Sequence, residues 1–167
     1  MFDGQRVELI EGEIVDMSPQ MSPHAMAISL TLLELQKAFP DSYVRMQLPL
    51  SFGSSSEPEP DLAVVTGKPR DYPTGHPQTA LLVVEVSDST LRYDRTRKAS
   101  LYARAGIEDY WVLNLVKKCL EVMRGPVEDG DAEFGWGYAS ITTLKSGDHV
   151  SPLAKPQAAI AVADLLP

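Results

Sequence analysis

Residues 80–86, with the sequence Ala-Leu-Leu-Val-Val-Glu-Val, form the most apolar run of the chain. A short apolar run that is bounded by polar segments is typical of a strand buried on both faces of a sheet. Strands of that kind occur in sheets that carry helices on both sides. We therefore expect residues 80–86 to form the central strand of an α/β fold.

The segments that follow this run predict a parallel crossover. Residues 94–105 have helical spacing, and Gly106 stands where a helix C-terminal cap favours glycine. Residues 110–115 then have the pattern of another strand. A strand, a helix and a strand in this order imply that the two strands are parallel. The sequence thus predicts a mixed central sheet flanked by helices.

The remaining elements are expected around this unit. Residues 6–17 predict a hairpin that turns at Glu11-Gly12, and residues 22–39 predict an amphipathic helix that begins at Ser22-Pro23 and ends before Pro40. We find no internal repeat and no linker to a second domain, so residues 1–167 are expected to form a single domain. Further strands are expected at residues 43–52, 62–65, 119–124, 136–144 and 159–161, and a short helix at residues 162–165.

Composition and cysteine content are those of an ordinary globular protein. The chain has 167 residues, of which 44% are hydrophobic and 23% charged. Cys119 is the single cysteine, so it has no internal disulfide partner, and it lacks the neighbouring ligands of a zinc site. We expect it to be a small, partly buried hydrophobic residue. No apolar segment reaches the length of a signal peptide or a membrane span, so we expect a cytoplasmic protein without a membrane partner.

The net charge of -8 limits how the chain can bind nucleic acid. Binding by electrostatics alone depends on many Lys and Arg contacts to phosphates, which an acidic protein does not offer. An enzyme remains compatible with this charge, because carboxylates that hold a metal ion add negative charge and the ion reverses the local sign.

Three charged residues occupy positions where packing alone favours apolar side chains. Glu85 interrupts the predicted central strand, where an ionised carboxylate needs a compensating partner. Lys98 lies on the same helical face as Leu101 and Tyr102, so its charge is expected to point toward the sheet. Asp61 stands directly before an apolar strand. We expect Asp61 and Glu85 on adjacent strands and all three charged groups to converge.

A convergence of two carboxylates and an ammonium group suits phosphodiester hydrolysis. The carboxylates of Asp61 and Glu85 are the hard oxygen ligands that Mg²⁺ or Mn²⁺ prefers, and such an ion polarises a phosphoryl group and activates water. Lys98 would orient that water or offset charge in the transition state. The alternative is a structural ion pair between Glu85 and Lys98, with Asp61 capping a turn.

Four segments of the chain resemble the Uma-type restriction endonuclease family of the PD-(D/E)xK superfamily, whose members share the restriction-endonuclease fold. Their order and spacing cover most of residues 6–115, and it is the combination that makes the match specific. The four segments are VELIEGEIVDMSP, EPEPDLAVV, LLVVEVSDST and DRTRKASLYARAGIEDYWVLN.

This resemblance implies a role for particular residues. The Pro-Asp motif of the family falls on Pro60-Asp61 and its second acid falls on Glu85, which makes both residues metal ligands. The lysine that usually follows two positions after the acid is replaced by Ser87, and Lys98 on the following helix is expected to take its place. The resemblance also suggests Glu13 as an additional acid.

Three further residues are weighed as supporting groups. Ser87 is expected to support the site through hydrogen bonds, because no Ser-His-acid arrangement is recognisable. Tyr102 is expected in the core, with the alternative that its hydroxyl contacts a phosphate or a catalytic group. His24, at the start of the first helix, is interpreted as incidental, with anion contact as the alternative.

The leading hypothesis is a metal-dependent endonuclease that uses Asp61, Glu85 and Lys98 on nucleic acid, with DNA as the expected substrate. The resemblance also leads us to expect a homodimer. A second hypothesis is a nucleic-acid-binding or assembly module that keeps the fold without turnover. The presence of all three catalytic residue types favours the enzyme, whereas the acidic composition and the lack of a recognition domain argue against tight, specific DNA binding.

Overall fold

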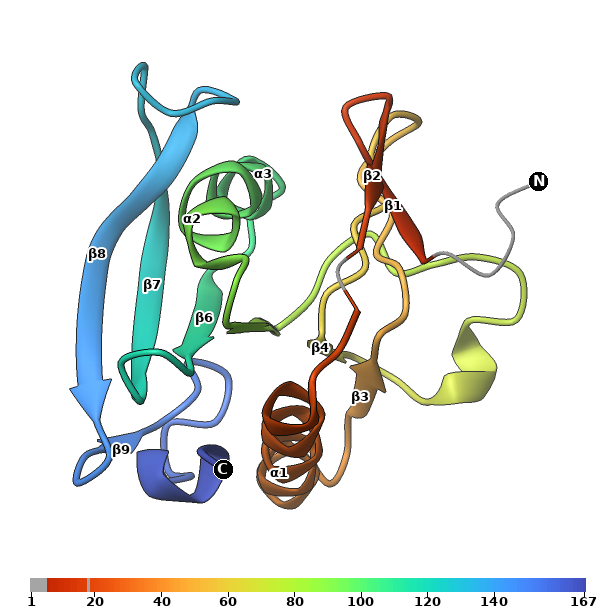
Figure 1. The fold of residues 1–167 in the computed structure, drawn as a ribbon. Coiled ribbons are helices and arrows are strands. Elements are labelled where there is room, and N and C mark those ends of the chain that lie inside the picture. The colour runs from red at the N-terminus through yellow and green to blue at the C-terminus, as the bar shows by residue number, and fades with distance from the viewer. Residues whose placement is uncertain (1–5, 18) are drawn as a thin grey trace.

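The computed structural model of the chain describes residues 6–17 and 19–167, and a six-stranded sheet forms its centre (Figure 1). The strand order is β3-β4-β5-β6-β7-β8. β5 and β6 are parallel and the other neighbouring pairs are antiparallel, which confirms the predicted mixed sheet. The strands are β3 (Tyr43–Met46), β4 (Leu62–Val65), β5 (Leu82–Ser87), β6 (Asp109–Asn114), β7 (Cys119–Glu128) and β8 (Trp136–Lys145).

A helix joins β5 to β6, as the sequence predicts. It consists of α2 (Leu91–Tyr93), a π-helical segment η2 (Asp94–Lys98) and α3 (Ala99–Arg104), which follow one another without a break and are called the crossover helix below. The helix begins three residues before the predicted start at residue 94. Gly106 has a φ angle of 77°, a left-handed conformation that glycine adopts without strain, so the predicted end of the helix is confirmed.

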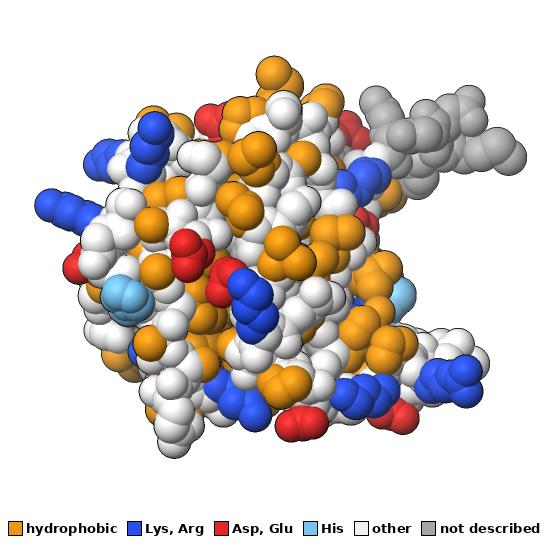
Figure 2. Space-filling view, turned by 90° about the horizontal axis from the view of Figure 1, so that it is seen from below, with side chains coloured by type: hydrophobic (Ala, Val, Ile, Leu, Met, Phe, Trp, Pro, Cys, Tyr) orange, Lys and Arg blue, Asp and Glu red, His pale blue; other side chains and the backbone are white. Residues whose placement is uncertain are grey.

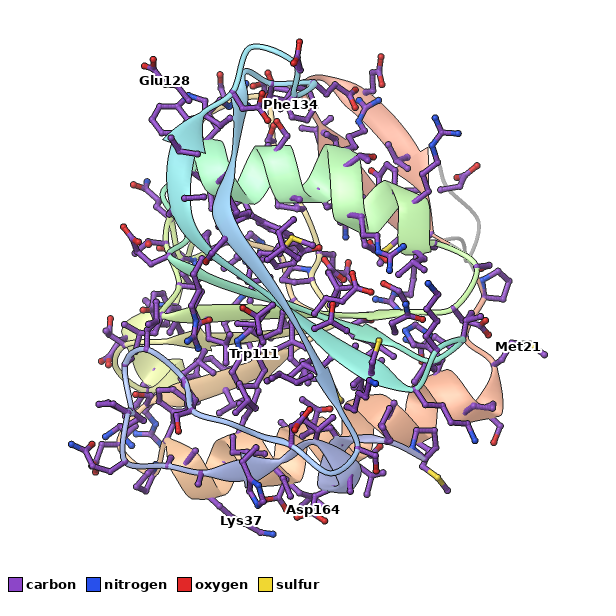
Figure 3. All side chains as sticks on the ribbon, turned by 90° about the vertical axis from the view of Figure 1, so that its left-hand side faces the viewer. Met21, Lys37, Trp111, Glu128, Phe134 and Asp164 are labelled. Carbon is purple, nitrogen blue, oxygen red and sulfur yellow. The ribbon has the colours of Figure 1, made fainter. Side chains whose placement is uncertain are left out.

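The other elements cover the two faces and one end of this sheet. α1 (Ser22–Ala38) lies on the face opposite the crossover helix, and the C-terminal η3 (Val162–Leu165) packs beside it (Figures 1 and 3). β1 (Val7–Ile10) and β2 (Glu13–Asp16) form the predicted hairpin. The shortest elements are η1 (Pro69–Asp71), β9 (His149–Val150) and β10 (Ile160–Ala161).

Two strands differ most in length from the predicted ones. The strand predicted at residues 43–52 ends at Met46, because Gln47 leaves the extended conformation with a φ angle of 52°. Pro49 follows and has no N–H group for a sheet hydrogen bond. β7 extends to Glu128, beyond the predicted residue 124, because β8 pairs with it along that whole length. The end of a strand thus depends on its partner as much as on its own sequence.

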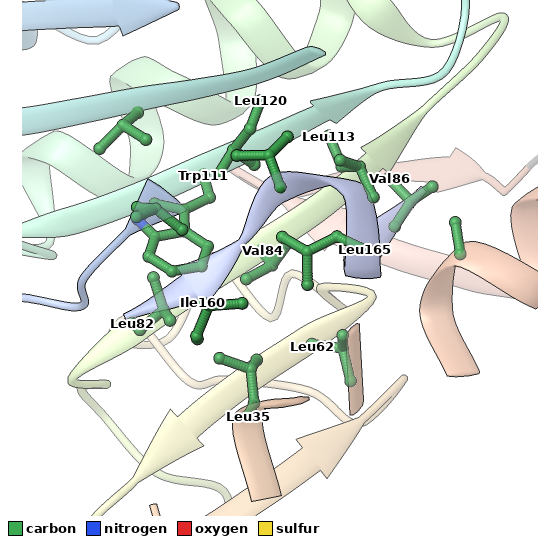
Figure 4. Close-up of a cluster of buried hydrophobic side chains, with 14 of the residues drawn as sticks. Leu35, Leu62, Leu82, Val84, Val86, Trp111, Leu113, Leu120, Ile160 and Leu165 are labelled. Atoms are coloured by element: carbon green, nitrogen blue, oxygen red, sulfur yellow. The ribbon is translucent and has the colours of Figure 1, made fainter. Parts of the chain in front are cut away.

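The core consists of two layers, one on each face of the sheet. Side chains alternate between the faces, so Leu82, Val84 and Val86 of β5 point toward α1, where Trp111 and the C-terminal segment complete the layer (Figure 4). Val83 points the other way, into a second layer beneath the crossover helix. The same alternation assigns Glu85 to the crossover-helix face.

The outer surface mixes hydrophobic and charged side chains. Seen from the α1 side, hydrophobic residues lie scattered among acidic and basic ones (Figure 2), and Met26 and Leu33 of α1 are each about half exposed. Cys119 is buried and free, in agreement with its expected packing role. In the described part of the chain, none of the helices has both the length and the apolar character needed to cross a membrane.

Candidate functional site

The register of β4 and β5 places Asp61 beside Glu85. Leu62 pairs with Val84 in this antiparallel pair, so Asp61, one residue before β4, lies opposite Glu85. The backbone N–H of Asp61 donates to Glu85 Oε2 at 3.3 Å, and the N–H of Val86 donates to Asp61 Oδ2 at 2.8 Å. Both carboxyl groups are buried. The two acids therefore lie on neighbouring strands, where the sequence predicts them.

Lys98 reaches this pair of acids from the crossover helix. Its ammonium group lies 2.9 Å from Glu85 Oε1 and also 2.9 Å from Glu8 Oε2, and only 3% of the residue is exposed. The structure thus brings Asp61, Glu85 and Lys98 together and adds Glu8. The sequence indicates the direction in which Lys98 points, because the rest of its helical face is apolar.

Tyr102 and Ser87 both lie close to the acids but have different partners. The hydroxyl of Tyr102 donates to Glu85 Oε1 at 2.7 Å, so this fully buried aromatic residue belongs to the core and also contacts the site. The hydroxyl of Ser87 donates instead to Asp94 Oδ2 at 2.6 Å. Ser87 thus supports Asp94, at the start of η2, rather than Asp61 or Glu85.

The structure does not bring Glu13 to the site. Its carboxylate receives a hydrogen bond from Arg97 at 2.6 Å, and its side chain is 67% exposed. Glu8, on the partner strand of the same hairpin, faces inward instead. The signal for Glu8 is present in the sequence, because alternation along β1 puts it on the same face as the buried Ile10. The additional acid thus comes from the other strand of the hairpin.

Two further titratable residues adjoin the site. His24 Nε2 lies 3.2 Å from Asp61 Oδ2, so this residue is not incidental to the site. Asp94 is buried and accepts hydrogen bonds from the hydroxyls of Ser87 and Thr90. Asp94 lies four residues before Lys98 on the same helical face, a signal visible in the sequence. The sequence offers no comparable signal for His24, because its contact joins segments 37 residues apart.

Burial and charge shift the protonation of the central pair. The pKa of Glu85 is raised to about 8, with burial as the largest cause; Lys98 opposes the shift, and the nearby carboxylates of Asp61, Asp94 and Glu8 add to it. Burial alone lowers the pKa of the Lys98 ammonium group, but the surrounding carboxylates outweigh burial and raise that pKa well above its ordinary value. Lys98 therefore stays charged, and Glu85 is a group whose charge depends on what binds beside it.

The pKa values of the two neighbouring groups, His24 and Asp94, are also shifted. The hydrogen bond with Asp61 and the negative charge of that carboxylate raise the pKa of His24, although burial counteracts part of the increase. Burial raises the pKa of Asp94, although Lys98 and two hydroxyl donors counteract part of that increase. The site concentrates perturbed groups, which is typical of functional sites and also of buried ion-pair networks.

A pocket of about 260 Å³ opens onto these residues between the β1–β2 hairpin, the start of α1, the end of β5 and the crossover helix. Among the described residues that line it, the basic ones are Arg6, His24 and Lys98. A phosphate group that enters such a pocket meets an excess of negative charge, unless a cation is bound there. The acidic lining residues are Glu8, Asp16, Asp61, Glu85, Asp88 and Asp94.

The donor chemistry of the pocket fits a hard divalent cation. Carboxylate oxygens of Asp61 and Glu85 are ligands of the kind that Mg²⁺ and Mn²⁺ prefer, and both residues line the pocket. In residues 6–17 and 19–167, no group of three or more His, Cys, Asp or Glu is already arranged to hold a metal ion. Two protein carboxylates with water completing the coordination are typical for Mg²⁺, so the residues fit the ion.

The fold places this protein in the class of nuclease-like α/β proteins. The model of the Uma2 family, described as "Putative restriction endonuclease", matches residues 1–163. The chain therefore belongs to the Uma2 family. No curated protein sequence matches the chain.

One solved structure supports the fold. The crystal structure of a "putative nuclease belonging to DUF820" from Anabaena variabilis superposes with a TM-score of 0.72 at 14% sequence identity, over 95% of this chain and 88% of that one. The type IIG restriction endonuclease BpuSI gives a TM-score of 0.40 at 19% identity, over 65% of this chain and 13% of that one. The first likeness confirms the nuclease-like fold.

Proposed function

We propose that this protein is a metal-dependent endonuclease that hydrolyses phosphodiester bonds of nucleic acid, with Asp61 and Glu85 as ligands of Mg²⁺ or Mn²⁺. The observation that carries the proposal is the contact of 2.9 Å between the ammonium group of Lys98 and Glu85, beside Asp61 in one acidic pocket. A bound divalent ion would polarise the phosphoryl group and lower the pKa of a water molecule.

Lys98 has a separate role in this proposal. An ammonium group has three N–H donors, and in the described structure Glu8 and Glu85 each lie 2.9 Å from it. One donor remains to orient water or to stabilise negative charge on a phosphoryl oxygen in the transition state. Tyr102 and Lys98 both donate to Glu85 Oε1, which leaves Oε2 as the oxygen of Glu85 nearer to Asp61.

DNA is the proposed substrate, because the family to which the chain belongs is described as one of restriction endonucleases. The net charge of -8 limits the affinity that the protein surface provides. The divalent ion then supplies much of the local attraction for the scissile phosphate. Since enzymes that cut both strands of a duplex often work as pairs, we propose that the protein acts as a homodimer.

The test is cleavage of supercoiled plasmid and of labelled single strands with Mg²⁺, Mn²⁺ or EDTA. We expect cleavage with either metal, none with EDTA, and a loss of at least about a hundredfold in Asp61→Asn. The exposed Asp71, in η1, provides the matched control, and Asp71→Asn should cleave like the native protein.

Full metal-dependent cleavage by Asp61→Asn would contradict the assignment. If the native protein binds Mn²⁺ and nucleic acid but cuts neither substrate, the result supports the second candidate, a binding or assembly module on the same fold. The acidic lining of the pocket disfavours that module without a bound metal, because it gives nucleic acid little to bind.

A further inference from the structure

We propose that His24 is an additional ligand of the divalent ion, and that its imidazole makes this site select Mn²⁺ over Mg²⁺. The inference rests on the proposed function, since it assumes that Asp61 and Glu85 hold a metal ion. It goes beyond that function because it assigns a nitrogen ligand and a metal preference to this chain.

The spacing of His24 and Asp61 is the first support. Nε2 of the imidazole lies 3.2 Å from Asp61 Oδ2. Ligand atoms at about 2.1 Å from an octahedral ion lie about 3 Å apart when they occupy adjacent positions. The two atoms are therefore already separated by the distance that a shared ion requires, and an ion between them takes the place of the hydrogen bond.

The position of His24 in the fold is the second support. α1 packs on the opposite face of the sheet from the crossover helix, yet its first turn brings His24 to the lining of the pocket. The side chain remains 20% exposed, and the contact of its Nε2 with Asp61 Oδ2 places the ring beside the start of β4. The imidazole thus reaches the acids from the side opposite Lys98, which approaches from the crossover helix.

The hydrogen bonds of Glu85 explain why the ligand set is incomplete before the ion binds. Its Oε1 accepts from Lys98 and Tyr102, whereas Oε2 accepts from the Asp61 backbone at 3.3 Å, a long contact. On this proposal Glu85 moves toward Asp61 and His24 when the ion binds. This agrees with the absence of a ready-made three-ligand group among the described residues.

A nitrogen ligand predicts a metal preference. Mg²⁺ demands oxygen ligands in near-ideal octahedral geometry and retains several waters, whereas imidazole binds transition metals better. Loss of one ligand should weaken Mn²⁺ binding at least as much as loss of a residue behind the ligands, which costs about 10- to 100-fold. Mg²⁺ binding should change less, so the selectivity for Mn²⁺ should fall when His24 is replaced.

The experiment is pulsed electron paramagnetic resonance of the full chain loaded with Mn²⁺, together with titration calorimetry for Mn²⁺ and Mg²⁺. We expect modulation from a directly bound ¹⁴N nucleus in the native protein and its loss in His24→Gln. Glutamine keeps an amide donor for Asp61 but has no ring nitrogen. The matched control is His76→Gln, because His76 is exposed and does not line the pocket.

Each outcome separates the inference from the proposed function. Bound Mn²⁺ without nitrogen modulation, or equal Mn²⁺ affinity in the native protein and His24→Gln, overturns the role of His24 and leaves the proposed function standing. If the native protein binds no Mn²⁺ at all, both fail. Nitrogen modulation in the native protein and in His76→Gln, with none in His24→Gln and an Mn²⁺ affinity at least about tenfold weaker there, supports the inference.

Discussion

The ammonium group of Lys98 connects the stability of this site with its chemistry. It lies between the carboxylates of Glu8 and Glu85, 2.9 Å from each, and all three residues are buried. A buried cation between two acids compensates charges that would otherwise be costly to remove from water. The same cation is the proposed group that offsets negative charge during phosphodiester hydrolysis.

The first prediction concerns the stability that Lys98 contributes. Lys98→Met should lower the free energy of unfolding by about 3–5 kcal/mol, because it leaves buried acids without a cation. The double variant Glu8→Gln with Lys98→Met should recover part of that loss, because it removes one of the uncompensated acids. Urea unfolding of the native protein, both single variants and the double variant measures the coupling. If the two changes are simply additive, the contact does not contribute as described.

The second prediction separates the two glutamates of the β1–β2 hairpin. Glu8→Gln should slow cleavage by at least about tenfold, since Lys98 loses one of the two partners that position it. Glu13→Gln removes an exposed contact with Arg97 and should leave cleavage unchanged, with a change in stability below about 1 kcal/mol. Single-turnover cleavage rates measure both effects. Equal cleavage rates for Glu8→Gln and Glu13→Gln would show that Glu8 has no role in the site.

The sequence identifies the central residues for a simple physical reason. Glu85 and Lys98 are charges inside apolar patterns, which makes them visible in the sequence without any structure. Glu8 carries a similar signal, but a short hairpin gives few alternating positions from which to decide which face is buried. Position in three dimensions, and not pattern, decides between Glu8 and Glu13.

At the scale of elements, two basic residues tie the crossover helix to the sheet. Lys98 faces β5, and Arg95 binds the buried Glu121 of β7 in a bidentate ion pair. Asn114 of β6 also donates to Glu121, at 3.0 Å. The helix is therefore held over β5, β6 and β7, which fixes the direction from which Lys98 approaches the acids.

The third prediction is that the stabilisation from the ion pair between Arg95 and Glu121 depends on pH. Burial alone raises the pKa of Glu121, but hydrogen bonds from Arg95 and Asn114 outweigh burial and lower it below the ordinary value of 4.5. A lowered pKa in the folded state means that the stabilisation is complete above pH 4.5 and is lost as the pH falls through the folded-state value. Glu121 thus contributes its full stabilisation at neutral pH.

Arg95→Met should therefore cost about 1–3 kcal/mol at neutral pH, a range between exposed and buried pairs because the Arg95 side chain is 36% exposed. The difference from the native protein should shrink steadily in acid, below about pH 4.5. Chemical denaturation over a pH series measures this difference. A cost that stays constant across the acidic range would show that the ion pair does not contribute through charge.

Most of the elements could be predicted from the sequence, because each has its own local pattern. The apolar run at β5, the helical spacing after residue 94 and Gly106 together predict the parallel crossover. Two features could not be predicted in this way. The end of β3 depends on the positive φ angle of Gln47, and the π-helical segment η2 has no distinct pattern of side chains.

At the scale of the whole molecule, the site is assembled from segments far apart in the chain. The β1–β2 hairpin contributes Glu8, and the first turn of α1 contributes His24. The start of β4 contributes Asp61, β5 contributes Glu85, and the crossover helix contributes Lys98. Patterns along the sequence predict which face of an element is buried, but not which elements approach one another from opposite sides. This is why the contact between His24 and Asp61 emerges only from the three-dimensional arrangement.

The excess of acidic side chains in this pocket also belongs to the scale of the whole molecule. Several elements contribute these acidic residues to the pocket. The net charge of the whole chain is also negative, so the rest of the protein compensates little of this charge. An ion pair with a purely structural role does not require a pocket beside it. An acidic pocket next to a charged lysine is consistent with a metal cation that binds there and attracts a phosphate group.

The most direct test of this account compares two buried glutamates, each bound to a basic residue of the crossover helix. Glu85→Gln and Glu121→Gln each remove a carboxylate from the sheet and take one acidic partner away from a cation of that helix. With both variants folded, metal-dependent plasmid cleavage should fall by at least about a hundredfold in Glu85→Gln and remain near the native rate in Glu121→Gln. Cleavage by Glu85→Gln at the rate of Glu121→Gln would contradict the assignment of Glu85 to the catalytic site.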